Sequence, residues 1–424
     1  MRRRVFGEGV TLMVVLCLWF VCGCRAYESA PIDWNEENRV WNAASGVRLV
    51  TPDDAARVAL VGNAELNRMR LKLAASRKVA QAAGWWEDPE LDFDFLRIVN
   101  PSENPFLLGA NLAFTIPLSG VPALERRAAE AYSAADAADI VAAEAETASA
   151  ARQAVVRLAF ARRAEAVLKD FDGDARIAGL LMTAERLSEA GEVAATDLAS
   201  AKRRRHERQH RLYRLAEESD AAEVDLRRLL GLTPSVKLDL AVDVDAAFVV
   251  DTNVVWTALD FTRHPRVRAA LARLEGGERA LEKEIRRQYP DLKIGPAYSR
   301  EEGEDRFGFV VGTTLPLWNR NRKGIATAEG ERDAAREEAI AAWRTVVTEA
   351  DAAVRKYRRL VAHGPERHPR RETADRLAEA GELKPLDYLA VREELLEAEL
   401  AETEWRLGVR LVAEELRKFE MEVN

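Results

Sequence analysis

The sequence predicts a mainly helical protein with a small β part, built from two copies of a unit in which a strand hairpin leads into a long helical hairpin. The 424 residues include only 23 glycines and 15 prolines, a balance that favours long helices. Two segments, "RLSEAGEVAATDLASA" from Arg186 and "RLAEAGELKPLDYLAV" from Arg376, repeat one glycine-interrupted pattern. Four short segments alternate apolar and polar residues, as half-buried strands do.

An export signal opens the chain. "MRRRVFGEGVTLMVVLCLWFVCGC" has an arginine cluster, an apolar run over 10–21 and small residues before Cys24. About 12 apolar residues are too few to cross a hydrocarbon core of roughly 30 Å. The ending "VCGC" resembles a bacterial lipoprotein signal, although Cys22 is an unusual occupant of its position. We therefore expect a signal peptide over 1–23 and acylation of Cys24; an ordinary cleaved signal with incidental cysteines is the alternative.

The positions of the cysteines and the net charge limit the functions that the mature chain can have. All three cysteines lie within the first 24 residues, so cleavage before Cys24 leaves one thiol and no internal disulfide. Lipid attachment is an obvious use for that thiol. The formal charge of -8 becomes about -10 once the basic signal is removed, which disfavours generic nucleic-acid binding.

The internal repeat divides the mature chain. Pro89 matches Pro290, Pro117 matches Pro316, and Gly191 matches Gly381, with the offset falling from 201 through 199 to 190. So long a period indicates a duplicated domain half rather than a solenoid. The predicted organisation is an N-terminal extension over 24–50, a first repeat over 51–240 and a second repeat over 241–424.

Each repeat begins with a helix of roughly 25 residues. In "TPDDAARVAL", Thr51 is the expected N-cap and Pro52 the first helical residue. Asp53 and Asp54 favour the positive end of the helix dipole.

Two alternating segments follow in each repeat and predict two hairpins. In "ELDFDFLRIV", Leu91, Phe93 and Phe95 fall on one side, opposite two aspartates. The other apolar sets are Leu108, Ala110, Leu112, Phe114 and Ile116; Leu292, Ile294 and Tyr298; and Phe307, Phe309, Val311 and Leu315.

A very long helical run follows each hairpin. From Pro122 to Ala190 only two glycines interrupt the pattern, so a continuous helix would span about 100 Å. In the second repeat Pro365 and Pro369 predict a break. Gly231 and Pro234 are expected to end the first repeat's last helix.

The strands require other chains. A sheet of four strands cannot close, and a bilayer leaves every open edge with unpaired backbone groups. Because transmembrane barrels have about eight strands or more, these four need partners, and three copies would supply twelve.

The ordered motifs resemble the TolC family of outer-membrane efflux proteins, in particular its lipoprotein branch. They are "LVTPDDAARVALVGNAEL", "DPELDF", "TIPLSG" and "TLPLWN", "AGEVAATDL" and "AGELKPLDYL", and "LRRLLGLTP". The likeness runs from Thr51 to the C-terminus in the family's duplicated order. The motifs are degenerate one by one, and specific as an ordered double set.

The resemblance implies a homotrimer whose twelve strands form one outer-membrane β-barrel, continued by a periplasmic α-helical barrel. A periplasmic adaptor protein and an inner-membrane pump of resistance-nodulation-division or ATP-binding-cassette type are the implied partners, besides outer-membrane lipid. Such a protein is a passive exit duct for small molecules or metal ions. A type I protein secretion duct is the alternative, and a periplasmic coiled-coil structural or adaptor protein is a third.

The resemblance also assigns site residues. Gly191 and Gly381 would turn the helical hairpins at the periplasmic entrance, and Asp387 would line that entrance. Where the best-known member has a second aspartate, this chain has Ala390, which weakens the expectation of a double acidic ring. Asp197, the counterpart in the first repeat, could be a helix N-terminal residue and nothing more.

The remaining polar motifs favour no catalysis and no cofactor. "KRRRHERQHRLYR", from Lys202 to Arg214, spreads around several helix faces, so a solvated surface or adaptor contact is expected rather than nucleic-acid binding. His206 and His210 have i, i+4 spacing without the HExxH pattern, and a solvent-facing pair is expected rather than a metal site. There is no phosphate-binding loop, and five histidines suggest no catalytic set.

Overall fold

The computed structural model describes residues 27–43, 47–97, 99, 106–246, 260–301, 304–365, 376 and 384–419. Cys24 and Gly381 lie outside these residues. The chain divides into two units, Met1–Gly46 and Val47–Asn424. The first contains helix α2 (Trp34–Asn42), whose N-terminus is capped by Asp33 and none of whose residues is buried.

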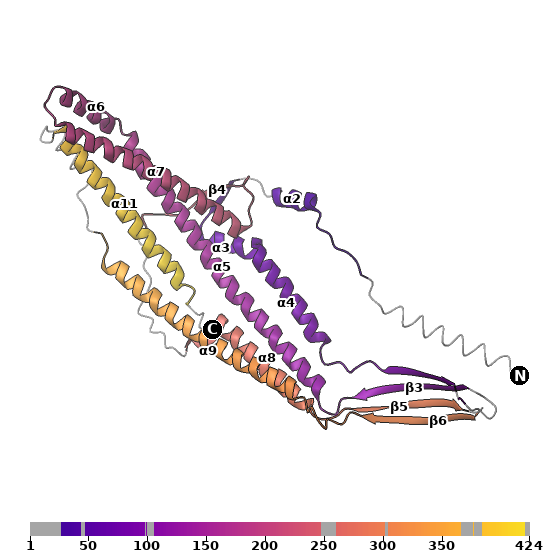
Figure 1. The fold of residues 1–424 in the computed structure, drawn as a ribbon. Coiled ribbons are helices and arrows are strands. Elements are labelled where there is room, and N and C mark those ends of the chain that lie inside the picture. The colour runs from indigo at the N-terminus through magenta and orange to yellow at the C-terminus, as the bar shows by residue number, and fades with distance from the viewer. Residues whose placement is uncertain are drawn as a thin grey trace. The chain divides into compact units, whose positions relative to one another are not determined.

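The second unit is mainly helical with a small β part, as predicted (Figure 1). Its helices are α3 (Pro52–Gly62), α4 (Ala64–Ala82), α5 (Val121–Gly173), α6 (Ala175–Glu189), α7 (Ala195–Leu230), η1 (Asp260–Arg263), α8 (Pro265–Arg286), α9 (Arg322–Ala362) and α11 (Pro385–Leu416). Its strands are β1 (Val47–Val50), β2 (Glu90–Arg97), β3 (Phe106–Ile116), β4 (Lys237–Leu240), β5 (Leu292–Glu301) and β6 (Glu304–Thr313).

The first repeat begins with two helices, so the prediction of one helix of roughly 25 residues was wrong. Thr51 caps α3 in a reciprocal capping box with Asp54, and Pro52 is the first helical residue, as expected. Asn63 then leaves the helical conformation, and its side-chain oxygen accepts the N–H groups of Glu65 and Leu66 at 3.0 and 3.1 Å. A single capping residue therefore starts α4.

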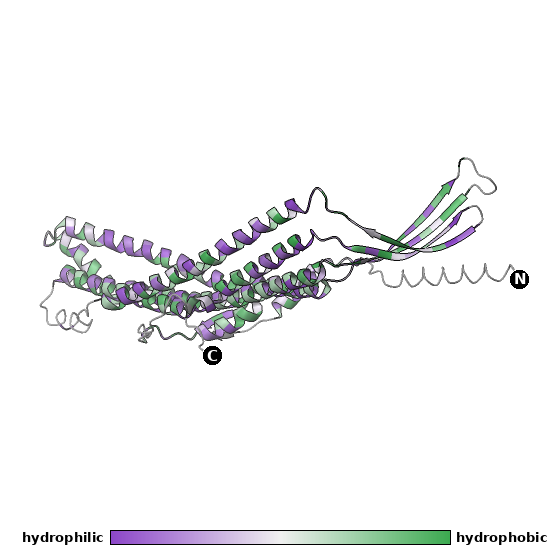
Figure 2. Cartoon of the chain, turned by 90° about the horizontal axis from the view of Figure 1, so that it is seen from below, coloured by the Kyte–Doolittle hydropathy of each residue, from purple (hydrophilic) through white to green (hydrophobic). Residues whose placement is uncertain are grey.

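The predicted strands form one antiparallel sheet in the order β2-β3-β5-β6. Residues in register share a face. Hydrophobic and hydrophilic residues alternate along the strands (Figure 2). One row across the sheet is therefore apolar or aromatic and the next is polar or small, so the two faces of the sheet differ. The first row consists of Phe93, Ala110, Tyr298 and Phe307, and the second of Asp92, Asn111, Ala297 and Gly308.

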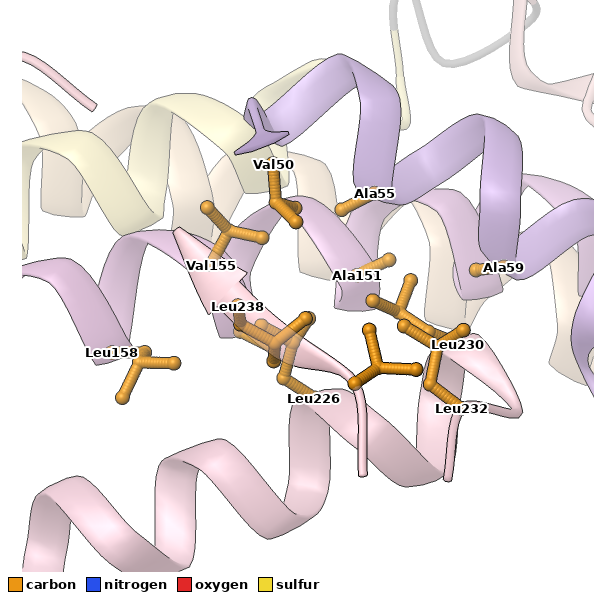
Figure 3. Packing of buried hydrophobic residues seen from close by; sticks show 12 residues of the cluster. Val50, Ala55, Ala59, Ala151, Val155, Leu158, Leu226, Leu230, Leu232 and Leu238 are labelled. Atoms are coloured by element: carbon orange, nitrogen blue, oxygen red, sulfur yellow. The ribbon is translucent and has the colours of Figure 1, made fainter. Parts of the chain in front are cut away.

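A second, two-stranded sheet was not predicted. Val47–Val50 pairs in parallel with Lys237–Leu240, so the two ends of the first repeat lie side by side. Together with this sheet, α3, α5 and α7 bury a common core (Figure 3). That core contains Val50, Ala55, Ala59, Ala151, Ala154, Val155, Leu158, Leu226, Leu230, Leu232, Val236 and Leu238.

Small residues allow the helices of this core to approach closely. A Cβ on Gly62 would lie 2.4 Å from the carbonyl oxygen of Leu230, and one on Gly231 would lie 2.3 Å from that of Gly62. Gly231 also ends α7 in the left-handed conformation, at φ 67°, which confirms its predicted role.

The prediction of a continuous helix over 122–190 was wrong, because the helix is broken at Asp174. Helix α5 has 53 residues, about 80 Å at 1.5 Å per residue, and ends at Gly173. Asp174 is extended, and its carboxylate accepts the N–H of Arg176 at 2.9 Å to cap α6. In the second repeat, α9 ends at Ala362, shortly before Pro365, as predicted.

The second repeat has its own core around the start of α8, the middle of α9 and the end of α11. His264 caps α8 beside this core, with its ring 6.2 Å from that of Phe419. Burial is the main reason that the pKa of His264 lies below its ordinary value, and the nearby Arg266 adds to the effect. His264 is therefore a neutral cap near neutral pH.

The hydropathy of the described helices is low. None of them combines the length and the apolar character that a single helix needs to cross a bilayer.

Candidate functional site

The candidate entrance is the region where the end of α5, the α6–α7 turn and the start of α11 meet. A buried cluster joins the four helices there, and its members are Val167, Leu168, Phe171, Ile177, Leu181, Ala201, Leu389, Leu396 and Leu400. This cluster fixes the positions of the polar groups around it.

Gly191 lies in the turn between α6 and α7. Its φ is 81°, and its N–H donates to the carbonyl of Ser188 at 3.1 Å while the N–H of Glu192 donates to that of Leu187 at 2.8 Å. These bonds are those of a Schellman motif, in which the left-handed residue reverses the chain after a helix. A Cβ at Gly191 would touch nothing within 4 Å. Glycine is therefore favoured here by backbone conformation and not by space.

Asp387 occupies the third position of α11, after Lys384 as N-cap and Pro385 as first residue. Its side chain is exposed. Asp197 holds the same position in α7, which begins at Ala195. A carboxylate there stabilises the positive end of a helix, so both aspartates have a local structural role. Asp387 differs in that a proline, Pro385, fixes the backbone two residues before it.

A buried ion-pair network links α7 to α11. The Glu393 carboxylate accepts from Arg204 Nε at 2.6 Å and also pairs with Arg208, whose Nε lies 3.3 Å from Asp172 at the end of α5. The side chains of Arg208 and Glu393 are only 7% and 12% exposed. The Arg208 guanidinium also lies 4.8 Å from the ring centroid of Phe171. Charges this buried depend on their partners.

A second buried arginine joins α11 to the break between α5 and α6. Arg392 is 5% exposed at its side chain and donates to Asp174 at 3.4 Å. It also donates to the Tyr388 hydroxyl at 3.0 Å. Asp174 thus caps α6 with one oxygen and holds α11 with the other.

The exposed polar residues have simpler roles. Lys202 on α7 contacts Glu185 on α6 at 2.8 Å, and this hydrogen bond is the main reason that the pKa of the Glu185 carboxyl is lowered. His206 and His210 are both exposed, with their Nε2 atoms 3.3 Å apart. Across the described part of the chain, no cluster of three or more histidine, cysteine, aspartate or glutamate side chains is arranged to hold a metal ion.

A groove of about 860 Å³ runs between α7 and α11, lined by arginines of one helix and glutamates of the other. A second cavity of about 470 Å³ continues it where α5 forms the floor. Arg211 lines both, and it pairs with Glu397 at 2.7 Å. Long charged side chains therefore bridge the two helices across this groove.

The turn at Gly191 was predicted and is present, whereas the role of Asp387 at an entrance stays a prediction. Sequence reasoning missed Asp172, Asp174, Arg392 and Glu393. A signal was present. Arg204, Arg208 and Arg211 recur at helical spacing in the first repeat, and Glu393 and Glu397 do so at the corresponding place in the second. Complementary charge on two helices predicted to be neighbours indicates pairing between them, and not only a solvated face.

Solved structures with the same fold cover nearly the whole chain. The Campylobacter jejuni CmeC outer membrane channel matches with a TM-score of 0.67 and 16% identity, over 93% of this chain and 93% of that chain. The open state of the Neisseria gonorrhoeae MtrE outer membrane channel matches with 0.66 and 16%, over 87% and 88%. CusC, described for its folding and transmembrane channel formation, matches with 0.68 and 14%, over 92% and 94%.

No protein-family profile and no curated protein matches the sequence. The likeness to these channels therefore rests on the fold, and it confirms the fold that the ordered motifs suggested.

Proposed function

We propose that this protein is the outer-membrane channel component of a tripartite efflux system. Its fold is that of bacterial outer-membrane channels over most of both chains. The function follows from what the sheet and the helices can do once several copies assemble.

The two unlike faces of the sheet carry the proposal. Exposed side chains on one face are apolar, with Phe93, Phe307 and Phe309 exposed by 67%, 84% and 81%. Such a face suits lipid, and the polar face suits a water-filled lumen. Strands β2 and β6 form the two edges of the sheet. Pairing β2 of one copy with β6 of the next removes all edges, and three copies form a barrel of twelve strands.

The helices extend the barrel as a duct in the periplasm. Helix α5 alone is long enough, at about 80 Å, to carry the duct well beyond the membrane. The entrance at the α6–α7 turn and the start of α11 would meet a periplasmic adaptor, and an inner-membrane pump of resistance-nodulation-division or ATP-binding-cassette type would supply the energy. The protein acts as a passive conduit and not as an enzyme.

The mature N-terminus would be anchored to the outer membrane by a lipid on Cys24. Export of the protein in an outer-membrane-bearing bacterium tests both parts of the proposal. We expect cross-linked, heat-labile trimers in the outer-membrane fraction, and incorporation of a clickable palmitate analogue that Cys24→Ser abolishes. A soluble monomer contradicts the channel. Equal labelling of the Cys24→Ser variant contradicts lipidation alone.

Asp387 would line the entrance of the trimer and set its ion preference. Three carboxylates around a narrow axis raise the local negative potential and attract cations. We expect Asp387→Ala to increase the conductance of the channel in planar bilayers and to reduce its cation preference.

Asp197→Ala is the matched control, because Asp197 occupies the same helical position in the first repeat. Both variants lose a similar helix-end interaction, about 0.3–1 kcal/mol. If Asp387→Ala leaves the conductance and the cation selectivity of the channel unchanged, Asp387 does not line the entrance.

A further inference from the structure

The turn from β6 into α9 carries three cationic side chains that form no ion pair with any described residue. Arg320, Arg322 and Lys323 are all exposed. Other arginines nearby are compensated: Arg287 contacts Glu284 at 2.8 Å, and Arg332 contacts Glu278 at 3.4 Å. The turn is therefore a local surplus of positive charge.

The backbone of this turn is held in an unusual conformation. Arg320 and Asn321 have φ values of 42° and 51°, in the left-handed region that residues other than glycine seldom adopt. The Asn321 amide donates to the backbone carbonyl and side chain of Glu284 on α8, at 2.8 and 2.7 Å. These bonds offset the strain and fix the direction in which the neighbouring cations leave the backbone.

The cations are not a requirement of the fold. Arg322 and Lys323 lie in the first turn of α9, which contains no acidic residue. Positive charge is unfavourable there, because the helix dipole is positive at its N-terminus. The corresponding helix of the first repeat begins with "VPAL", which is uncharged. The junction between the strand hairpin and the long helix thus carries no cations in the first repeat and three in the second.

The position of the turn relative to the apolar face of the sheet indicates its partner. The odd-numbered apolar residues of β6 continue past the strand as Leu315 and Leu317, which are 63% and 61% exposed. Strand β6 ends at Thr313, and the Leu317 N–H donates to the Leu315 carbonyl at 2.9 Å, so the chain turns after Leu315. From Phe307 to Leu315 the chain spans at most about 28 Å, and at a tilt of about 40° this gives about 21 Å, close to the roughly 25 Å height of a barrel's apolar band. Trp318 follows immediately and is 86% exposed.

This order of an apolar band, a tryptophan and then cations is that of a membrane interface. Tryptophan prefers the level of the headgroups, and clustered lysine and arginine attract anionic lipid. Each cation near an anionic surface favours binding by about fivefold.

We propose that Trp318, Arg320, Arg322 and Lys323 form a binding surface for the headgroups of anionic phospholipids in the leaflet on the helical side of the membrane. This inference rests on the proposed channel function, which places the sheet in the bilayer. By binding headgroups on the periplasmic side, the basic turn then fixes how deeply each protomer lies in the membrane.

Native mass spectrometry of the full-length protein in detergent, supplied with equal amounts of phosphatidylglycerol and phosphatidylcholine, tests the proposal. We expect the wild-type trimer to retain phosphatidylglycerol at least about fivefold over phosphatidylcholine. The Arg320→Gln/Arg322→Gln/Lys323→Gln variant should show no preference. An Arg320→Lys/Arg322→Lys variant should keep it, because charge and not guanidinium shape is recognised.

Arg126→Gln/Arg127→Gln is the matched control, since these two exposed arginines follow the corresponding junction of the first repeat. Equal loss of phosphatidylglycerol in this control, or an unchanged preference in the triple variant, overturns the proposal. Displacement of the lipid by about 10 mM inorganic phosphate would show that the surface binds soluble anions, and would also overturn the proposal. The same spectra report the trimer, so a trimer without lipid preference contradicts this inference and leaves the channel function intact.

Discussion

Replacing Phe93 by arginine should abolish the membrane-inserted trimer. Phe93 lies near the middle of β2 and is 67% exposed on the apolar face of the sheet. Arginine on the lipid-facing side at the bilayer midplane costs about 2–4 kcal/mol, and the cost occurs three times in a trimer. We expect the Phe93→Arg protein to be lost from the outer-membrane fraction, as measured by cross-linking and fractionation.

Asn111→Arg is the control for that experiment. Asn111 lies in β3 directly opposite Asp92, on the other face of the sheet, and its amide lies 3.4 Å from the carboxylate of Asp94. In the proposed barrel an arginine there would face the polar lumen between two carboxylates, so the trimer should persist and only its conductance should change. Loss of both variants, or survival of both, contradicts the assignment of the two faces.

Glu393→Ala should strongly destabilise the helical part. It removes the carboxylate shared by Arg204 and Arg208, and Arg208 is only 7% exposed. Breaking a buried ion pair costs about 3–5 kcal/mol, and we expect the lower end because Asp172 still contacts Arg208. The measurement is the thermal unfolding of the proposed trimer, monitored by circular dichroism.

Glu397→Ala provides the comparison one helical turn later. Glu397 pairs with Arg211 between the same two helices, but its side chain is 59% exposed. An exposed pair contributes about 0–1 kcal/mol, so this variant should unfold close to the wild type. Replacing both Arg208 and Glu393 by leucine should restore much of the stability lost in Glu393→Ala. Equal effects of Glu393→Ala and Glu397→Ala would show that burial does not matter here.

Periodicity and capping residues predicted most of the fold. The alternation in "ELDFDFLRIV" identified β2 because one apolar face recurs every second residue, and Thr51 and Gly231 marked helix ends by local chemistry. Asn63 and Asp174 were missed as breaks. Each is a single polar residue inside a helical pattern that caps the next helix, and its tertiary partner, Leu229 or Arg392, also holds it there.

The candidate site was predictable only in part, because its strongest interactions join distant segments. Gly191 could be found because a left-handed turn has a sequence signature. The contact between Arg208 and Glu393 spans 185 positions, and its only sequence signal is complementary charge on two helices from different repeats. The β1–β4 pair was invisible for the same reason: four residues are too few for a periodic pattern, and their partner lies 190 positions away.

The parallel pairing of Val47–Val50 with Lys237–Leu240 also has a consequence for the order of folding. In the export that we propose, the N-terminus emerges first, so β1 would leave the translocation machinery long before its partner. Contacts between distant segments form late, because the loop between them must close first. The β1–β4 pair would therefore be missing until residue 240 has emerged, and periplasmic chaperones would have that interval in which to bind the unpaired strand β1.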